Sequence, residues 1–406
     1  MKNIPEKLII LILFLVQFID VLDFMVVMPL GPDFADQLGI AESNLGWIAS
    51  SYTIAAAFAG ILSSTFIDKF ERKAVLIFTL FGLCLANVFS ANAWNIESML
   101  ASRFLAGTFG GPATSLCFAI VADLFDDKKR GSVMGKVMSG FSLAAIFGVP
   151  IGLEMATRFG WKSSFYMVSA LSFIAILLII AYLPKITVHL SSYRPKVTYL
   201  SLFNKSSYNL SFVAVAIGSM AAFMIIPYFS PFIQFNLEFP RNNMSQIYFI
   251  GGAGSFFAMH IAGKFVDKTS SSFSTMISNI FILFTLIFGL ILAAKFIPVL
   301  ALFPPFMVGM AIRNVSNFTL YSKVASSHDR AGFMSVISCV QHIASSLGAV
   351  LASFILVDTD GKLQNMEITA IIAGTLFLVA PFILNRIEKH IARKKMQDRI
   401  AAYSEF

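Results

Sequence analysis

Charged residues are scarce in this chain. Asp, Glu, Lys and Arg make up 13% of its 406 residues, whereas hydrophobic residues make up 57%. Soluble globular domains carry about 25% charged residues. The shortage therefore excludes a soluble enzyme or binding domain and indicates a protein with many membrane-spanning segments.

Cysteine is also rare, and a nucleotide-hydrolysis motif is lacking. Cys84, Cys117 and Cys339 all lie in apolar stretches, where we interpret them as packing residues, and we expect no metal site. The sequence contains no G-x-x-x-x-G-K-[ST] stretch, so we expect neither an enzyme nor a bound cofactor. The net charge of +8 is spread over short loops between apolar stretches, which argues against a nucleic-acid partner.

Long apolar stretches are abundant. A helix needs about 20 apolar residues to cross a bilayer. We predict an all-α membrane protein with twelve such helices, at residues 8–30, 44–66, 74–94, 97–124, 132–157, 162–184, 208–235, 244–266, 273–294, 297–322, 332–357 and 367–387. Lys and Arg are concentrated in the even-to-odd connections, the central loop and both tails, which predicts cytoplasmic termini.

The two halves of the chain resemble each other. The sequence Phe66–Lys69 matches Phe265–Lys268, and Arg130-Gly131 matches Arg330-Ala331, in each case about 200 residues later. We predict two pseudo-symmetric six-helix bundles, at residues 1–184 and 207–388. A cytoplasmic loop at 185–206 joins them, and the basic tail at 389–406 is predicted to lie against lipid headgroups as a short amphipathic helix.

The first span, Leu8–Leu30, carries two carboxylates, Asp20 and Asp23. A charged group in the middle of a bilayer is costly. The two residues are three positions apart, so they share a helix face with Gln17, one turn before. Such a polar stripe must face a water-filled cavity or other helices, which indicates transport.

The loop after the second span resembles a motif of the major facilitator superfamily, G-x-x-x-D-[RK]-x-G-R-[RK]. Within that family the whole chain is most similar to bacterial drug:proton antiporters and sugar-efflux carriers. Ser64 and Glu71 replace the two motif glycines. The resemblance implies a gate that holds the bundles together when the transporter faces outward, whereas a plain basic loop is the alternative. The gating residues would be Asp68, Lys69 and Arg72, with Asp267 and Lys268 in the second half.

Two further motifs carry the resemblance. Arg103 begins an R-x-x-x-G sequence, which implies an arginine that faces the first span and tunes proton exchange; a snorkelling arginine near Glu97 is the alternative. Gly148, Pro150 and Gly152 resemble the G-V-P-L-G form of the sugar-efflux branch. That motif implies antiport, and its residues are expected to kink the fifth span and pack it tightly.

The second half supplies candidates for the substrate cavity. Arg313 and Asn317 belong to an unusually polar run in mid-span, and His342 lies midway through its own span. Phe223 and Tyr228 on the seventh span are aromatic candidates, although most rings are expected to face lipid or pack between helices. A basic second half opposite an acidic first span suits an anionic or zwitterionic substrate.

We therefore predict a proton-driven efflux antiporter in the bacterial cytoplasmic (inner) membrane. Asp23 resembles the family's acidic site on the first helix more clearly than Asp20, and either residue, or both in turn, would carry the proton. The alternatives are an uptake symporter or a specific metabolite or siderophore carrier; a receptor or structural protein fits badly. We expect a monomer whose partners are a small-molecule substrate, protons and the lipid bilayer.

Overall fold

The computed structural model describes residues 5–66, 69–187, 190, 202–294, 296–325, 329–359 and 361–404. Asp68 lies outside the described residues, and so does the side chain of Asp267. Within the described chain, 12 helical stretches are long and apolar enough to cross a membrane, which confirms the predicted number. The protein is an all-α membrane protein.

The first six spans come from the first half of the chain. Their helices are α1 (Glu6–Val26), α3 (Leu45–Phe66), α4 (Arg72–Ala91), α5 (Ile96–Leu124), α6 (Asp127–Leu143) continued by α7 (Val149–Phe159), and α8 (Lys162–Tyr182). The other six are formed by α10 (Ser206–Ile225), α12 (Met244–Lys268), α13 (Ser271–Phe284), α14 (Val299–Leu302) with α15 (Pro304–Val324), α16 (Arg330–Ile355) and α17 (Met366–Ser404).

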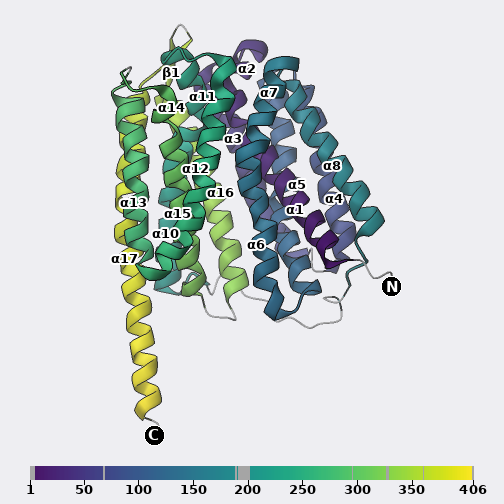
Figure 1. Cartoon of the computed structure of the whole chain (residues 1–406), viewed down its shortest axis with the longest axis vertical. Helices are drawn as coiled ribbons and strands as arrows, with labels where there is room; N and C mark the ends of the chain where they lie inside the picture. The colour runs from purple at the N-terminus through teal and green to yellow at the C-terminus, as the bar shows by residue number, and fades with distance from the viewer. Residues whose placement is uncertain are drawn as a thin grey trace.

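Each half forms one bundle (Figure 1), with the purple-to-teal helices beside the green-to-yellow ones. The helix α1 begins and α17 ends at the same end of the molecule, which we call the termini face. The opposite end, the distal face, carries α2 (Gly31–Leu38) and the antiparallel hairpin of β1 (Val357–Thr359) and β2 (Lys362–Gln364).

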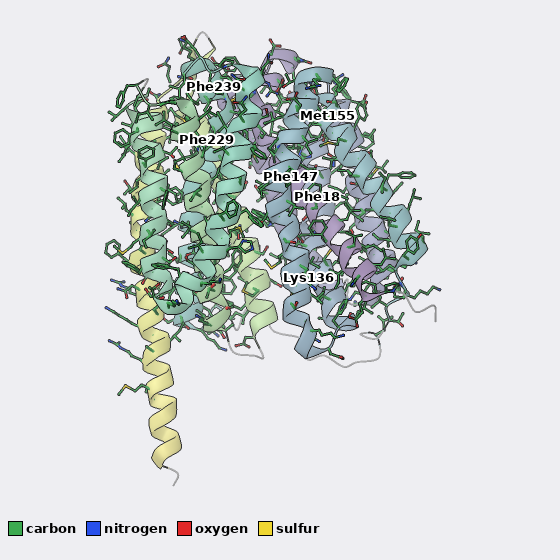
Figure 2. The ribbon with its side chains drawn as sticks, viewed as in Figure 1. Phe18, Lys136, Phe147, Met155, Phe229 and Phe239 are labelled. Atoms are coloured by element: carbon green, nitrogen blue, oxygen red, sulfur yellow. The ribbon has the colours of Figure 1, made fainter. Side chains whose placement is uncertain are left out.

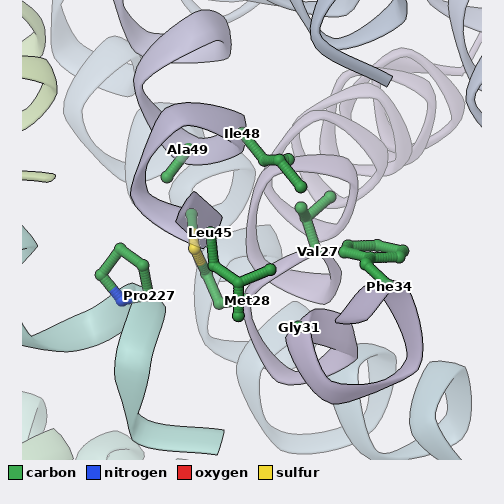
Figure 3. Close-up of a pocket in the computed structure, with 8 residues that line it drawn as sticks. All are labelled: Val27, Met28, Gly31, Phe34, Leu45, Ile48, Ala49 and Pro227. Atoms are coloured by element: carbon green, nitrogen blue, oxygen red, sulfur yellow. The ribbon is translucent and has the colours of Figure 1, made fainter. Parts of the chain in front are cut away.

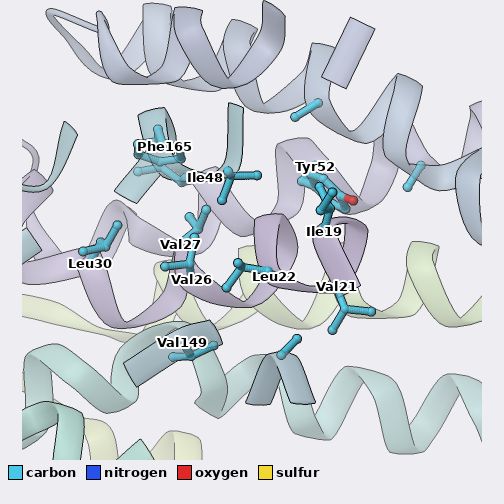
Figure 4. Packing of buried hydrophobic residues seen from close by; sticks show 14 of the residues in the cluster. Ile19, Val21, Leu22, Val26, Val27, Leu30, Ile48, Tyr52, Val149 and Phe165 are labelled. Atoms are coloured by element: carbon cyan, nitrogen blue, oxygen red, sulfur yellow. The ribbon is translucent and has the colours of Figure 1, made fainter. Parts of the chain in front are cut away.

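Two seams join the bundles. The helix α3 packs against α16, and α12 packs against α7 and the π-helical turn η4 (Ala144–Gly148). Glycine makes both approaches possible: a Cβ at Gly46 would collide with the backbone oxygen of Ala349, and one at Gly252 would lie 2.6 Å from that of Ala145. Within the first bundle, side chains such as Leu22, Ile48 and Phe165 form a buried core (Figure 4).

Several spans are interrupted by proline or by a π turn, and two of these interruptions bear on the site. Pro29 interrupts the first span with the 3-10 turn η1 (Met28–Leu30), after which the chain continues as α2 to Leu38 rather than ending at Leu30 as predicted. Val27 and Gly31 meet Leu45 and Pro227 at this break (Figure 3). In the fifth span, η4 separates α6 from α7 and places Pro150 in the first turn of α7.

The last helix is longer than its span requires. About 20 residues suffice to cross a bilayer, yet α17 continues without a break for 39 residues, from Met366 to Ser404. Figure 1 shows this extension projecting beyond the rest of the molecule at the termini face. The tail therefore continues the twelfth span along its axis, whereas the sequence predicted a separate short helix lying on the membrane.

Candidate functional site

The helix α5 presents one functional face to α1. Arg103, Gly107, Gly110 and Thr114 are spaced by three or four residues, so they share that face. The helix α1 runs antiparallel to it, and its Asp23 meets Arg103 while Asp20 meets Thr114. Both carboxylates therefore face α5, as their three-residue spacing predicted.

Asp23 is held by a bidentate ion pair. Arg103 Nη1 donates to Asp23 Oδ1 at 2.8 Å, and Nη2 donates to Oδ2 at 3.0 Å. Arg103 is 1% exposed and Asp23 is fully buried, so Arg103 does not snorkel. The ring of Tyr52 lies over the guanidinium, 5.0 Å from Cζ. The paired geometry fixes both charges in place.

Asp20 has a different environment. Thr114 Oγ1 donates to Asp20 Oδ2 at 2.9 Å, whereas Oδ1 is buried without a hydrogen-bond partner. A Cβ at Gly110 would lie 2.8 Å from Oδ1 and 2.5 Å from the hydroxyl of Tyr52, so glycine keeps this space open. Within the described chain, no cationic side chain forms an ion pair with Asp20. This carboxylate can bind a proton without breaking an ion pair.

A cavity of about 270 Å³ lies between the two bundles. Along α12 its wall extends from Ile247 to Met259, which corresponds to about 18 Å of helix. Much of the lining is aromatic or methionine, including Phe24, Phe223 and Met310. Phe24 follows Asp20 by four residues, so the face of α1 that carries Asp20 continues into the cavity wall.

Three of the predicted cavity residues, Phe223, Arg313 and Asn317, line this cavity. Arg313 is 2% exposed, and its two Nη atoms have no hydrogen-bond partner in the described structure. Its Cζ lies 4.8 Å from the centre of the Phe377 ring. A Cβ at Gly218 would collide with Nη2, so this glycine makes room for the guanidinium.

The structure places Tyr228, Gln17 and His342 away from the described wall of this cavity. Tyr228 is fully buried, and its hydroxyl lies 3.2 Å from the backbone oxygen of Ser43 and 3.1 Å from that of Ala349. It therefore lies in the α3–α16 seam, outside the described lining of the cavity. Gln17 is buried, and its Oε1 has no partner among the described atoms.

Polar contacts close the distal face between the bundles. Arg241 Nη2 donates to Asp33 Oδ2 at 2.6 Å, and the backbone nitrogen of Glu42 donates to Asp358 Oδ2 at 3.2 Å. Nearby, Ser230 Oγ donates to the backbone oxygen of Pro29 at 2.9 Å. Sequence reasoning missed these contacts, because the partners come from opposite halves of the chain and match no motif.

The bundles separate toward the termini face. Where α12 crosses η4, a Cβ at Gly252 would lie 2.6 Å from the backbone oxygen of Ala145. About three turns nearer the termini face, Cβ atoms at Gly263 of α12 and Gly135 of α6 would have no neighbour within 4 Å. Figure 2 places Lys136 on this half of α6 and Phe147 higher on the same span. The site is thus closed distally, and the bundles diverge below it.

The loop that resembles the family motif organises the first bundle. Arg72 Nε lies 3.1 Å from Asp123 Oδ2, and both side chains are buried, so this pair ties α4 to α5 within one bundle. Glu71, which replaces a motif glycine, caps α4 by accepting from the backbone nitrogens of Lys73 at 2.8 Å and Ala74 at 2.9 Å. It also accepts from Ile186 N at 2.8 Å.

The remaining gating candidates are only partly described. Lys69 is exposed, and Lys268 is exposed in the last turn of α12. Asp68 and the side chain of Asp267 lie outside the described residues. Gly148 and Gly152 pack the fifth span against α1, since their Cβ atoms would lie 2.9 Å from Leu22 Cδ1 and 2.6 Å from Val26 Cγ2. Pro150 lies between them.

An ion pair also anchors the start of the second bundle. Lys205 donates to Asp329, and Tyr208 Oη donates to the same carboxylate oxygen at 2.9 Å. The hydrogen bond to Asp329 raises the pKa of Lys205 above its ordinary value, which keeps the ammonium charged. This contact joins α10 to the segment that precedes α16.

The sequence model that describes the Major Facilitator Superfamily matches residues 13–349, which is most of the chain. The protein belongs to the Major Facilitator Superfamily. It is a transporter rather than an enzyme, and a small-molecule substrate is expected. The motifs in the loop after α3 and in α5 thus identified the family correctly from the sequence.

Relatives of this MFS transporter differ in what their names report. The MFS-type transporter YtbD of Bacillus subtilis (strain 168) is 25% identical over 373 residues, which cover 90% of this chain and 91% of YtbD. The multidrug resistance protein MdtL of Shewanella sp. (strain ANA-3) is 29% identical over 140 residues, which cover 34% of this chain and 35% of MdtL.

Solved structures show the same fold at low sequence identity. The crystal structure of a D-xylose-proton symporter superposes with a TM-score of 0.80 at 14% identity, covering 93% of this chain and 97% of the symporter. That likeness establishes the fold of this MFS transporter.

Proposed function

We propose that this transporter is a proton-coupled antiporter that exports a small organic molecule across the bacterial cytoplasmic membrane, with both termini in the cytoplasm. The observation that carries the proposal is Asp20: a buried carboxylate without a cationic partner, on the α1 face that continues into the cavity wall. The name of MdtL, a multidrug resistance protein, supports export. The concentration of Lys and Arg near the termini face supports the orientation.

Asp20 rather than Asp23 carries the proton in this proposal, although the motif context favoured Asp23. Asp23 already has two hydrogen bonds from Arg103, so its protonation would leave a buried guanidinium without its counter-charge. Protonation of Asp20 breaks no ion pair and removes a buried charge. Arg103 and Tyr52 then position Asp23 and separate its negative charge from Asp20.

The transport cycle uses two arrangements of the same bundles. We assign the arrangement with closed distal contacts to the state whose cavity exchanges with the cytoplasm. Opening the distal face would release the substrate outside and let a proton reach Asp20, and the return step would release that proton inside and free the cavity for new substrate. The membrane potential contributes about 2.3 kcal/mol per charge for each 100 mV.

A symporter is the second candidate, because the D-xylose-proton symporter has the same fold. Flux in proteoliposomes distinguishes the two. With an acidic lumen and a neutral exterior, an antiporter is expected to accumulate substrate inside as protons leave, whereas a symporter would drive preloaded substrate out. A substrate flux that does not change when the pH gradient is imposed in either direction would overturn proton coupling itself.

Replacing Arg241 with Ala is expected to loosen the distal face. The half-buried Asp33–Arg241 pair contributes on the order of 1 kcal/mol, so its loss should raise the population open to the distal side about fivefold. The measurement is the labelling rate of Ser219→Cys, a cavity position, by an impermeant thiol reagent added outside. The three native cysteines are first replaced by Ala.

Arg158→Ala is the matched control. Arg158 pairs with Glu154 on the exposed surface of the same helix, α7, so this ion pair does not connect the two bundles. The labelling rate of Arg158→Ala should equal that of the parent. A rate in Arg241→Ala that also equals the parent would contradict a gating role for the Asp33–Arg241 pair.

A further inference from the structure

We propose that the cavity binds an organic anion with an apolar body, and that Arg313 is the residue that recognises its negative charge. This inference deepens the proposed function, since it names the class of cargo. It depends on the cavity and not on proton coupling, so the two can fail separately.

The strongest observation is the contrast among three buried arginines in the described part of the chain. Arg72 pairs with Asp123 and Arg103 pairs with Asp23, in each case through a carboxylate oxygen at 3.1 Å or less. Arg313 is equally buried, but both of its Nη atoms lack an acceptor. Leaving a buried guanidinium unpaired is costly unless a ligand completes it.

The Phe377 ring does not replace that missing acceptor. It lies 4.8 Å from Cζ of Arg313, a distance typical of a cation–π contact, which supplies no hydrogen-bond acceptor. The N–H groups point outward in the plane of the guanidinium and need oxygen acceptors. A carboxylate matches two of these N–H groups at once.

Further donors lie on the same helix face. Asn317 and Tyr321 follow Arg313 by four and eight residues, and both line the cavity. The hydroxyl of Tyr321 has no hydrogen-bond partner in the described structure. The Oδ1 atom of Asn317 already accepts from Thr275 Oγ1 at 3.3 Å, so the amide presents its NH₂ group as a donor. This wall offers mainly donors, which suits an acceptor-rich anion.

The rest of the wall suits an apolar body. Phe223, Phe256, Met307 and Met310 lie around the polar wall of α15. Among the described residues that line the cavity there is no Asp, Glu or Lys, so a cation would find Arg313 and no counter-charge. A cavity of about 270 Å³ accommodates a molecule of one or two rings.

Equilibrium binding to the purified full-length protein, without a pH gradient, tests this assignment. The probes are naphthalene-2-carboxylate, its neutral carboxamide and 2-naphthylmethylammonium, which share one apolar body and differ in charge. The carboxylate is expected to bind at least tenfold more tightly than either of the others. Equal affinities, tighter binding of the ammonium or no binding of the carboxylate would overturn the proposal.

Variants of Arg313 separate recognition from structure. Arg313→Gln should remove the preference for the carboxylate, while Arg313→Lys should retain part of it. Arg313→Met should also raise the melting temperature of the ligand-free protein, because it removes an unpaired buried charge; a structural arginine would lower it. An unchanged carboxylate affinity in Arg313→Gln would overturn the assignment.

A second variant keeps the test valid if the Arg313 variants fail to fold. Gly218→Ala leaves the charge in place but puts a methyl group where the guanidinium lies, so it should weaken carboxylate binding at least tenfold. Gly289→Ala is its matched control, since its Cβ would meet its nearest neighbour, Phe303, at 3.5 Å, an ordinary contact. If Gly218→Ala bound the carboxylate as tightly as the parent protein does, Arg313 would not be the residue that recognises the anion.

Discussion

Replacing Asp20 with Asn is expected to abolish uphill transport in proteoliposomes while substrate binding persists. Asn has nearly the same shape and can still accept the hydrogen bond from Thr114, but it cannot exchange a proton. Substrate flux should then fall to the passive level at every imposed pH gradient. Proton release on substrate addition, followed with a pH-sensitive dye, should disappear in the same variant.

Asp36→Asn is the control for this change. Asp36 belongs to the same first span, in α2, but is exposed on the distal face, so its loss should leave coupling intact. Thr114→Val removes the hydrogen bond to Asp20 and keeps the carboxylate, and its transport should persist with a shifted pH profile. Gradient-driven accumulation in Asp20→Asn at the parent's level would assign the proton to another group.

Breaking the Asp23–Arg103 pair is expected to destabilise the protein more than any other single change discussed above. Either Asp23→Asn or Arg103→Gln leaves one buried charge without its partner, which costs about 3–5 kcal/mol. Thermal unfolding in detergent, followed by circular dichroism, should show a large fall in melting temperature for both variants.

The double variant Asp23→Asn/Arg103→Gln provides the decisive comparison. It carries no unpaired charge, so it should be more stable than either single variant. Transport by the double variant should also distinguish a structural role of the pair from a role in proton coupling. Because Asp20 is intact, gradient-driven flux in the double variant is expected to exceed that in either single variant. Additive losses in the double variant would show that the two side chains contribute independently of each other.

Hydropathy and charge predicted the fold well, because each span must satisfy its backbone hydrogen bonds internally and be apolar over its length. The number of spans was confirmed. The first span was predicted to end at Leu30, because hydropathy does not register the 3-10 turn at Pro29 or its continuation to Leu38. The tail was predicted as a separate short helix, whereas α17 continues without a break to Ser404, because helical segments on either side of a change in hydropathy can join into one helix.

The candidate site was predictable where helical spacing determines it. Three-residue spacing put Asp20 and Asp23 on one face, and the family motif placed Arg103 opposite them. The spacing also placed Thr114 on the same face of α5 as Arg103, since the two residues are eleven positions, or about three turns, apart.

Contacts between the halves were not predictable in the same way. Whether an aromatic residue such as Tyr228 lines a cavity or seals a seam depends on how two bundles dock. Asp33 and Arg241 pair although they are 208 residues apart in sequence. No local periodicity encodes either arrangement.

The two halves carry opposed charges, the buried carboxylate of Asp20 on α1, which we propose binds the proton, and the guanidinium of Arg313 on α15, whose Nη atoms have no partner among the described atoms. These charges bear on the electrical signature of transport. A proton that enters while an organic anion leaves moves two elementary charges in the same electrical direction. At 100 mV this exchange would release about 4.6 kcal/mol, enough for an anion gradient on the order of a thousandfold even without a pH difference. The carrier would therefore generate a current with every turnover.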